Sequence, residues 1–364
     1  MLLTEIKYDC RFFVGHIPCK PNKQFNVQCV NDNGTCPYYS KSKESILIIK
    51  LGAAGDVIRT TPLLTKINET YPNAYIYWLT QFPDLVPSRV PEYNGADRIY
   101  NWELNSLLSL QGMEFDWVIN LDKDEQACAL VRTLKAKKYS GYTLVNNKPY
   151  PEDEKAEHKY LTGVFDGISK SNTKNYMEEI FEVCGYEFEK EEYILPAYDK
   201  ESKFEIDHSK TVVGLNTGCG GRWTSRLWPE NYWIELIEKL KKENYEVILL
   251  GGPEEHEKNE RMSEQTKTKY FGVKPLKTFI GLMDQCDIIV SAVTMGMHIA
   301  IGLRKKLVLL NNIFNRNEFE LYGRGEIIEP SKPCTCYFTP KCKNEEYSCI
   351  EYIFPDEVLR AVKG

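Results

Sequence analysis

Hydrophobic residues in the first half of the chain gather in short runs, and the stretches between the runs have helical spacing. The runs cover 46–51, 74–80 and 115–121, with weaker ones at 97–102 and 137–143. Short apolar runs bounded by glycine are typical of buried strands in an α/β sheet. Helical stretches fall at 57–70, 103–112, 124–135 and 177–184. Pro62 is tolerated in the first of them only near a first turn or at a kink.

The second half repeats this alternation after a charged stretch at 186–210, which contains Pro196 and is the expected domain connection. Strands are expected at 211–216, 246–252, 287–292 and 306–312. Helices are expected at 294–303 and at 229–242, where Pro229 opens a helix with one apolar face. Two successive arrays of this kind predict two Rossmann-like α/β domains that face each other across a cleft.

The length and composition fit this organisation. A chain of 364 residues with 42% hydrophobic residues suits two domains of ordinary size. We expect Rossmann-like domains at 45–195 and 205–330, with Cys-rich segments at 1–44 and 331–364. A net charge of −6 with no domain-wide basic excess argues against nucleic acid as a partner. The N-terminus has no secretory signal pattern and no apolar run is long enough to span a membrane, so we expect a cytoplasmic protein.

A carboxylate follows the first predicted strand. The small residues at 52–55 form a turn that ends in Asp56. Open α/β sheets bind ligands at the carboxyl ends of their strands, and the start of a helix favours an ionised acid. Asp56 is therefore the candidate general base, and Gly55 and Arg59 beside it are candidates for contact with an acceptor. Asp122 follows the strand at 115–121 and is a third such candidate, although a solvated helix start explains it equally well.

The loop at 217–229 joins a predicted strand to a helix and contains three glycines, three hydroxyl side chains and two arginines. Exposed backbone N–H groups and guanidinium groups form a binding site for a pyrophosphate. The candidates here are Thr217, Gly218, Arg222 and Arg226. The alternative is an ordinary loop whose arginines face the solvent. Three tryptophans near this loop either stack on a base or pack in the core.

Two further strand ends carry candidate donor-binding residues. In the stretch 291–298 a strand gives way to a helix whose free N–H groups suit a second phosphate, and His298 lies one turn into that helix. A histidine in such a place is also a common packing residue. Gly252 and Glu254 follow the strand at 246–252, where an acid would hold a ribose hydroxyl or simply lie in solvent at a helix start.

Two common nucleotide-binding patterns are missing. The turn at 52–56 lacks the spacing G-x-G-x-x-G, and the second strand ends without the acid expected at a ribose. The chain also lacks G-x-x-x-x-G-K-[ST]. A dinucleotide oxidoreductase and a P-loop kinase or ATPase are therefore disfavoured.

Three segments resemble glycosyltransferase family 9, the heptosyltransferases of the lipopolysaccharide inner core. The sequence GDVIRTTPLL at 55–64 resembles the family's N-terminal signature, the segment 226–230 resembles its basic-x-Trp-Pro-Glu motif, and Thr294–Gly302 resembles its third signature. The resemblance implies a GT-B fold and inverting transfer of a sugar from ADP-heptose without a catalytic metal. It also implies that Asp56 is the base and that Arg226 contacts the donor diphosphate.

The same resemblance implies that Thr217, Thr294, Gly296, Met297 and His298 line the donor phosphates, and Met295 among them is a further candidate for donor binding. The chain departs from the family where an acid is replaced by Val293 and a glycine by Met295. The Thr-Met-x-Met-His form at 294–298 is similar to the branch that glycosylates bacterial autotransporter proteins. The acceptor therefore stays open between a saccharide and a protein hydroxyl. Peripheral membrane contact and the oligomeric state stay open as well.

Eight of the twelve cysteines fall into two terminal sets of four. Each set has the number of thiols that a tetrahedral zinc or iron site, or an iron–sulfur (Fe-S) cluster, needs, but neither has paired C-x2-C spacing. The alternatives are free thiols and disulfides. A closed four-thiolate site would be structural, and the autotransporter-directed branch carries a cysteine-bound iron near its C-terminus. The candidate ligands are Cys10, Cys19, Cys29, Cys36, Cys334, Cys336, Cys342 and Cys349.

The sequence thus predicts a glycosyltransferase acting on a nucleotide sugar. Two alternative hypotheses for the function remain. One is a different GT-B nucleotide-sugar enzyme, such as an epimerase or hydrolase, and the other is a non-catalytic, metal-stabilised binding protein.

Overall fold

The computed structural model describes residues 2–31, 34–90 and 94–364 of the chain. Contacts between residues divide them into two compact units. The first unit runs to Leu51 and resumes over Leu63–Ala156, and the second comprises Gly52–Pro62 and Glu157–Gly364. The short segment at 52–62 therefore packs with the C-terminal half of the chain, although it directly follows the first strand of the N-terminal sheet.

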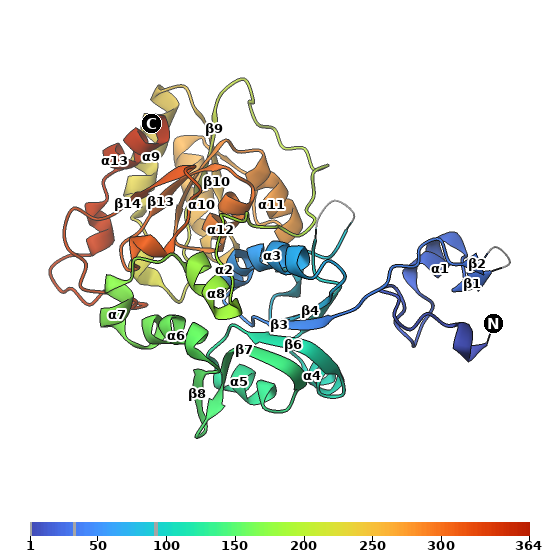
Figure 1. Ribbon diagram of the computed structural model, residues 1–364. Coiled ribbons are helices and arrows are strands. Elements are labelled where there is room, and N and C mark those ends of the chain that lie inside the picture. The colour runs from blue at the N-terminus through green and yellow to red at the C-terminus, as the bar shows by residue number, and fades with distance from the viewer. Residues whose placement is uncertain (1, 32–33, 91–93) are drawn as a thin grey trace. The chain divides into compact units, whose positions relative to one another are not determined.

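The first unit is built on a six-stranded sheet (Figure 1). Five strands are parallel, and the last pairs antiparallel with its neighbour. Their spatial order is β5 (Arg98–Asn101), β4 (Tyr75–Thr80), β3 (Ser45–Ile49), β6 (Glu114–Asn120), β7 (Lys135–Val145) and β8 (Lys148–Pro151). In chain order the parallel strands run 3-2-1-4-5, which is the Rossmann arrangement.

Helices α3 (Pro62–Thr70), α4 (Leu104–Gln111) and α5 (Glu125–Val131) connect these strands. One apolar core of this unit joins side chains of β3 and β6 to those of α4 and α5. Its members are fully or almost fully buried, including Leu47, Ile49, Leu110 and Ala127. Burial of this kind is the main stabilising contribution to such a domain.

The segment before the sheet contains little regular structure. It holds a 3-10 turn at Leu3–Glu5, helix α1 (Lys20–Phe25) and a two-stranded hairpin of β1 (Val30–Asn31) and β2 (Gly34–Thr35). Among its described residues before Ser45, Pro21 alone is buried. This segment therefore has no apolar core of its own, and other interactions must hold it together.

The second unit contains a six-stranded sheet in which all strands are parallel. The spatial order is β11 (Lys269–Tyr270), β10 (Glu246–Leu250), β9 (Val212–Asn216), β12 (Ile288–Ala292), β13 (Lys306–Leu310) and β14 (Gly325–Ile328). In chain order this is 3-2-1-4-5-6. The strand order reverses between β9 and β12, which is where sheets of this type bind ligands.

The helices of the second unit are α2 (Ala54–Thr60), α6 (Glu157–Val164), α7 (Asp166–Ser171), α8 (Tyr176–Cys184), α9 (Glu230–Lys242), α10 (His256–Thr266), α11 (Leu276–Asp284), α12 (Met295–Gly302) and α13 (Pro355–Lys363). Helix α13 packs against α9, and α2 packs against α12 (Figure 1). Trp233, Leu236, Ile237 and Leu240 of α9 are buried in the core of this unit, which confirms the predicted apolar face.

Most predicted strands and helices are present within a few residues of their expected limits. Pro62 divides the predicted helix at 57–70 into α2 and α3 and stands first in α3, because proline lacks the N–H that an interior helical position needs. Gly185 ends α8 with a φ of 78°, a conformation that suits glycine. The stretch 186–210 contains no helix or strand. The helices α1, α6, α7, α10, α11 and α13 and the strands β1, β2, β8, β11 and β14 were not predicted.

The compact units and the predicted domains divide the chain differently. Residues 52–62 and 157–195 pack with the second unit although the chain order puts them with the first.

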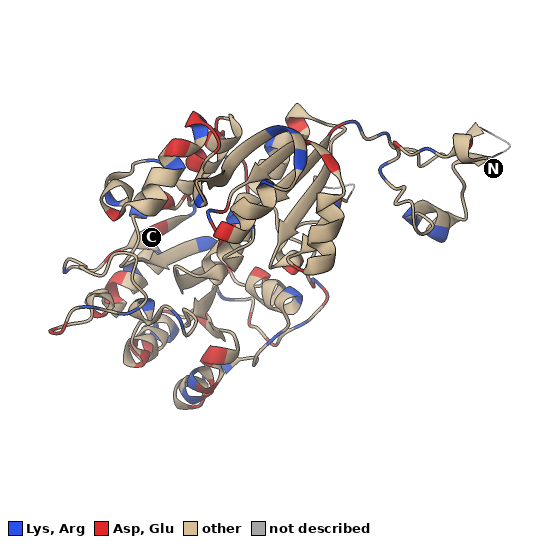
Figure 2. Cartoon of the chain, turned by 90° about the horizontal axis from the view of Figure 1, so that it is seen from below, with Lys and Arg blue, Asp and Glu red and all other residues tan. Residues whose placement is uncertain are grey.

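Lys and Arg are intermingled with Asp and Glu along the helices (Figure 2). No helix among the described residues combines the length and apolar character that crossing a membrane requires.

Candidate active site

The carboxyl ends of β9 and β12 in the second unit carry the polar residues that the sequence singled out. Asn216, the last residue of β9, donates from Nδ2 to Ser291 Oγ at 2.9 Å and to Thr294 Oγ1 at 3.0 Å. A side chain at Gly296 would come within 2.7 Å of that Nδ2 atom. Glycine at 296 thus lets the start of α12 approach the neighbouring strand end closely.

Arg226 is the buried cation of this region, with 9% of its surface exposed. Its guanidinium donates from Nη1 to the carbonyl oxygen of Val293 and from Nη2 to that of Cys219 at 3.3 Å. Its Nε is buried and has no hydrogen-bond partner among the described residues. Burial lowers the pKa of Arg226 to about 10, so the group stays charged near neutral pH. No ion pair of the described residues includes it.

A buried positive charge without a carboxylate beside it is costly unless an anion completes it. Carbonyl oxygens orient the Arg226 guanidinium but do not neutralise it. The aromatic rings of Trp223 and Phe314 lie 5.4 Å and 5.5 Å from its central carbon. The arrangement suits an anionic ligand at this strand end.

Thr217 is buried, and its Oγ1 donates to Asn259 Oδ1 at 2.6 Å. Lys258 of α10 donates from Nζ to the Thr217 carbonyl oxygen at 2.8 Å, and burial lowers the pKa of this lysine. The sequence analysis missed Lys258 because a lysine within a charged helix is normally exposed to solvent. The Thr217 hydroxyl is already engaged, so its backbone N–H and carbonyl fix the loop.

Glu255 holds the loop that follows β10, whereas its neighbour Glu254 does not. Glu255 accepts a hydrogen bond from the Gly252 N–H at 2.9 Å, and a side chain at Gly218 would overlap its carboxylate. Glu254 is exposed, and its carboxylate lies beside Gly221. Arg222 is also exposed. The structure therefore brings Gly218 and Gly252 together and leaves Arg222 and Glu254 at the surface.

The candidate base, Asp56, lies in the first turn of α2, and its side chain is 32% exposed. Its Oδ1 pairs with Arg59 Nη2 at 2.8 Å, and its Oδ2 accepts from the Ala53 N–H at 3.3 Å. The carboxylate is therefore oriented by two partners and remains accessible. A cation and a helix start both favour its ionised form.

Arg59 connects Asp56 to residues that the sequence did not single out. Its Nη1 pairs with Glu318 Oε1 at 2.8 Å, and its guanidinium carbon lies 3.5 Å from the centre of the Tyr176 ring. Burial alone would lower the pKa of Arg59, but the carboxylates of Asp56 and Glu318 outweigh it and raise that pKa. Glu318 and Tyr176 are distant from Arg59 in the chain, so no local pattern could have identified them.

His298 lies under the Asp56 turn. A side chain at Gly55 would overlap the imidazole, and the Tyr193 ring stacks at a centroid distance of 6.1 Å. Burial, reinforced by the charge of Arg59, lowers the pKa of His298 to about 3. The ring is therefore neutral near pH 7, and its Nδ1 is buried without a partner among the described residues. Met297 is fully buried and faces the core, whereas Met295 and Thr294 are partly exposed.

Asp122, the acceptor candidate of the first unit, is 5% exposed. It accepts from Lys50 Nζ at 2.5 Å and from the Leu51 N–H. Lys50 follows β3 and Asp122 follows β6, so the pair joins two neighbouring strand ends. These contacts favour a structural role for Asp122 over direct contact with an acceptor.

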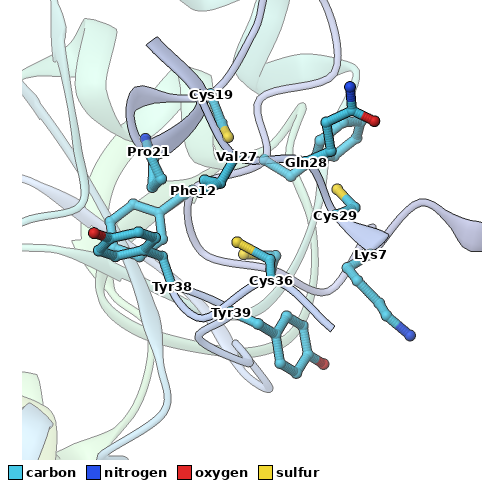
Figure 3. Close-up of a pocket in the computed structure, with 12 residues that line it drawn as sticks. Lys7, Phe12, Cys19, Pro21, Val27, Gln28, Cys29, Cys36, Tyr38 and Tyr39 are labelled. Atoms are coloured by element: carbon cyan, nitrogen blue, oxygen red, sulfur yellow. The ribbon is translucent and has the colours of Figure 1, made fainter. Parts of the chain in front are cut away.

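The four N-terminal cysteines line one small cavity of about 20 Å³. Figure 3 shows Cys19, Cys29 and Cys36 among the apolar and aromatic residues around it. Cys10 completes the set. None of the twelve cysteines forms a disulfide.

The four C-terminal cysteines approach one another in two pairs. The Sγ atoms of Cys334 and Cys349 are 3.0 Å apart, and those of Cys336 and Cys342 are 3.5 Å apart. In the described ranges, no three His, Cys, Asp or Glu side chains are arranged as a group that could hold a metal ion. The four isolated cysteines, Cys128, Cys184, Cys219 and Cys286, are buried.

Comparison with known proteins places these features in a family. A model of glycosyltransferase family 9 (heptosyltransferase) matches residues 107–347. Lipopolysaccharide core heptosyltransferase OpsX from Haemophilus influenzae is 22% identical over 280 residues, which cover 72% of this chain and 78% of OpsX.

Solved structures share the fold. A family 9 glycosyl transferase from Veillonella parvula aligns with a TM-score of 0.66 at 17% identity, covering 88% of this chain and 97% of that one. The iron-containing dodecameric glycosyltransferase TibC from enterotoxigenic E. coli aligns with a TM-score of 0.54 at 14% identity, covering 92% of this chain and 80% of TibC. TibC has also been solved in complex with ADP-D-β-D-heptose. The predicted pair of Rossmann-like domains of the GT-B class is confirmed.

Proposed function

Because the chain belongs to glycosyltransferase family 9, we propose that it transfers heptose from ADP-heptose to a hydroxyl group with inversion at the anomeric carbon. The chain is an enzyme that moves a sugar from a nucleotide sugar. The proposal names heptose as the sugar and ADP as the nucleotide. It is supported by the heptosyltransferase activity named for OpsX and by the ADP-heptose bound to TibC.

The observation that carries the proposal is the buried guanidinium of Arg226. It lies at the carboxyl end of the sheet, where the strand order reverses, and its Nε has no partner in the described structure. A diphosphate supplies the acceptor oxygens and the negative charge that this group lacks. Free N–H groups at the start of α12 offer further contacts. When the donor splits, the same groups stabilise the charge that develops on the leaving diphosphate.

Asp56 supplies the proton acceptor. An acceptor hydroxyl loses its proton to the Asp56 carboxylate while its oxygen forms a bond to the anomeric carbon of the sugar. The bond from that carbon to the diphosphate oxygen breaks, and the electron pair leaves with the diphosphate. One displacement of this kind inverts the anomeric configuration. Arg59 holds Asp56 in place through their 2.8 Å ion pair.

The acceptor is proposed only by class, as a hydroxyl of a saccharide or of a protein. The proposal includes no oligomeric state, and peripheral contact with a membrane stays a prediction. The cytoplasmic location expected from the sequence also stays a prediction.

The two cysteine sets are proposed to hold structural zinc or iron, with no metal in the transfer step. Each set offers four thiols, which match the preferences of zinc and iron. In the C-terminal set, Cys336 Sγ accepts from the Lys343 N–H at 3.0 Å and Cys334 Sγ accepts from the Cys336 N–H at 3.3 Å. The N-terminal set would tie together a segment that lacks a core. Each set must rearrange so that its four thiols surround one point before it can form a closed site.

A donor panel and one variant test the transfer proposal. Among ADP-sugars and UDP-sugars, ADP-heptose should raise the melting temperature most, because a ligand of the folded state stabilises it in proportion to the logarithm of its concentration over its dissociation constant. Asp56→Asn should lower the rate of transfer to an inner-core saccharide or an autotransporter segment at least ~100-fold. ADP affinity should stay within about twofold. A transfer rate within threefold of the unmodified chain would rule out Asp56 as the base.

Elemental analysis tests the metal proposal. One metal ion is expected per cysteine set, and Cys29→Ser and Cys342→Ser should each remove one. Cys184→Ser is the matched control, because Cys184 is buried and lies outside both sets. A metal-free chain, or a mass lowered by disulfide formation, would overturn the proposal.

A further inference from the structure

We infer that the C-terminal cysteine segment, residues 334–349, positions the guanidinium of Arg226, and that the buried amide of Asn312 joins the two. The inference rests on the proposed diphosphate role of Arg226. It assigns a function to a segment that lies outside the sheet, and it makes Asn312 a positioning residue for the donor.

The residue before Arg226 is fastened to the cysteine segment. Ser225 is 3% exposed, and its N–H donates to the Pro340 carbonyl oxygen at 3.1 Å. Its Oγ donates to the Thr339 carbonyl oxygen at 2.7 Å. Thr224 Oγ1 adds a bond to Pro340 at 3.4 Å. The backbone just before Arg226 is thus fastened to residues 339–340.

The turn at 339–340 is in turn placed by the thiols. It lies between Cys336 and Cys342, whose Sγ atoms are 3.5 Å apart. Thr339 donates to the Cys336 carbonyl oxygen from its N–H at 3.1 Å and from its Oγ1 at 2.9 Å. Movement of either thiol would therefore shift the two carbonyl groups that hold Ser225.

Asn312 provides a second and more direct connection. It follows β13 and is 8% exposed. Its Nδ2 donates to the Ser225 carbonyl oxygen at 2.8 Å and to Cys349 Sγ at 3.3 Å. Cys349 Sγ lies 3.0 Å from Cys334 Sγ. One amide group therefore spans the distance from the thiol cluster to the residue next to Arg226.

The cysteine segment also builds the wall behind the guanidinium. Phe338 packs its ring against Trp223 and Phe314, with centroid distances of 5.6 Å and 5.5 Å. Those two rings are the ones that face Arg226. The Phe338 N–H donates to the Ile313 carbonyl oxygen at 2.9 Å, which anchors the wall next to Asn312. Small displacements of a binding group strongly reduce its contribution, so this support should matter for donor binding.

Titration calorimetry with ADP tests the inference. Asn312→Ala should raise the dissociation constant for ADP about tenfold, because a displaced guanidinium loses its charged bonds to phosphate. The matched control is Asn120→Ala in the first unit. Asn120 is also buried at a strand end, and its Nδ2 donates to a carbonyl oxygen and to a cysteine Sγ. The control should destabilise the chain comparably yet leave ADP affinity within twofold.

Two milder variants guard against misfolding of Asn312→Ala. Ser225→Ala removes only the bond to Thr339 and should weaken ADP binding two- to threefold. Cys349→Ala removes the thiol partner of Asn312 and should weaken it in the same direction. Unchanged ADP affinity in Asn312→Ala and Ser225→Ala would overturn the inference.

A double-mutant cycle separates this inference from the proposed function. If Asn312 acts through Arg226, then Arg226→Met with Asn312→Ala should bind ADP no more weakly than Arg226→Met alone. Additive losses would mean that Asn312 acts by another route and would overturn the inference. If Arg226→Met itself leaves ADP affinity unchanged, the diphosphate role fails, and the fault lies with the proposed function.

Discussion

The two sheets share one strand order, yet each treats the buried positive charge near its central strand ends differently. In the first unit, Lys50 and Asp122 form an ion pair of 2.5 Å, and both residues are 5% exposed. In the second unit, Arg226 is similarly buried but is oriented by carbonyl oxygens, with no carboxylate partner in the described structure. The first charge is neutralised within the chain, whereas the second is left for an anion.

This difference supports the proposal that the strand ends beside Arg226 bind the nucleotide sugar. Desolvating a charge costs several kcal/mol unless a partner offsets it. A fold that retains an uncompensated cation at the ligand-binding end of its sheet sacrifices stability there. The ion pair at the ends of β3 and β6 shows that a sheet of the same strand order can also neutralise such a cation with its own carboxylate.

The largest expected effect tests the structural side of the comparison. Lys50→Met leaves the Asp122 carboxylate buried without its lysine, so the first unit should lose about 3–5 kcal/mol of unfolding free energy. ADP affinity should not change. Denaturant unfolding followed by hydrogen exchange in each unit measures the loss of stability, and titration calorimetry measures the ADP affinity.

A double variant serves as the control for Lys50→Met. Adding Asp122→Leu removes the orphaned charge and should recover most of the lost stability. If Lys50→Met lowers the unfolding free energy by less than about 1 kcal/mol, the ion pair of Lys50 and Asp122 does not stabilise the first unit, and its contrast with Arg226 fails.

A smaller effect concerns acid sensitivity. Burial lowers the pKa of His298 in the folded chain to about 3, below the value of about 6.5 for an unfolded histidine. Between these values the unfolded chain binds more protons, so stability falls as the pH drops below about 6.5. The second unit should lose roughly 1–2 kcal/mol between pH 6.5 and pH 5.

His298→Phe should remove this acid sensitivity, because phenylalanine does not titrate. His208→Gln is the control, since His208 is exposed. Hydrogen exchange at the two pH values should show the loss in the second unit, where His298 lies. Equal acid sensitivity in the His298→Phe chain would contradict the assigned environment.

The sequence predicted the repeated strands and the strand-end loops well, because buried parallel strands leave a strong local signal. It missed β8, β11 and β14, which are short or lie at sheet edges. It also placed 52–62 with the first domain, whereas α2 packs on α12 of the second unit. Such packing depends on contacts between distant segments and leaves no local pattern.

Some residues of the candidate site have a local signal in the sequence, and others do not. Asp56 and Arg226 stand out locally as a carboxylate and a cation after strands, and the structure gives both an environment that suits their proposed roles. Glu318 and Lys258 were missed because nothing in their local sequence distinguishes them from charged residues at the surface. Asp122 has the same kind of sequence signal as Asp56, but its pairing with Lys50 is visible only in three dimensions.

The most direct test of the account is the dissociation constant of ADP for the Arg226→Met chain, measured by calorimetry beside the unmodified chain. A charged bond to phosphate contributes about 1.5–3 kcal/mol, so the account predicts affinity at least about tenfold weaker, with no loss of unfolding free energy. Unchanged ADP affinity, or a chain destabilised as strongly as Lys50→Met, would show that Arg226 is a structural charge rather than the diphosphate site.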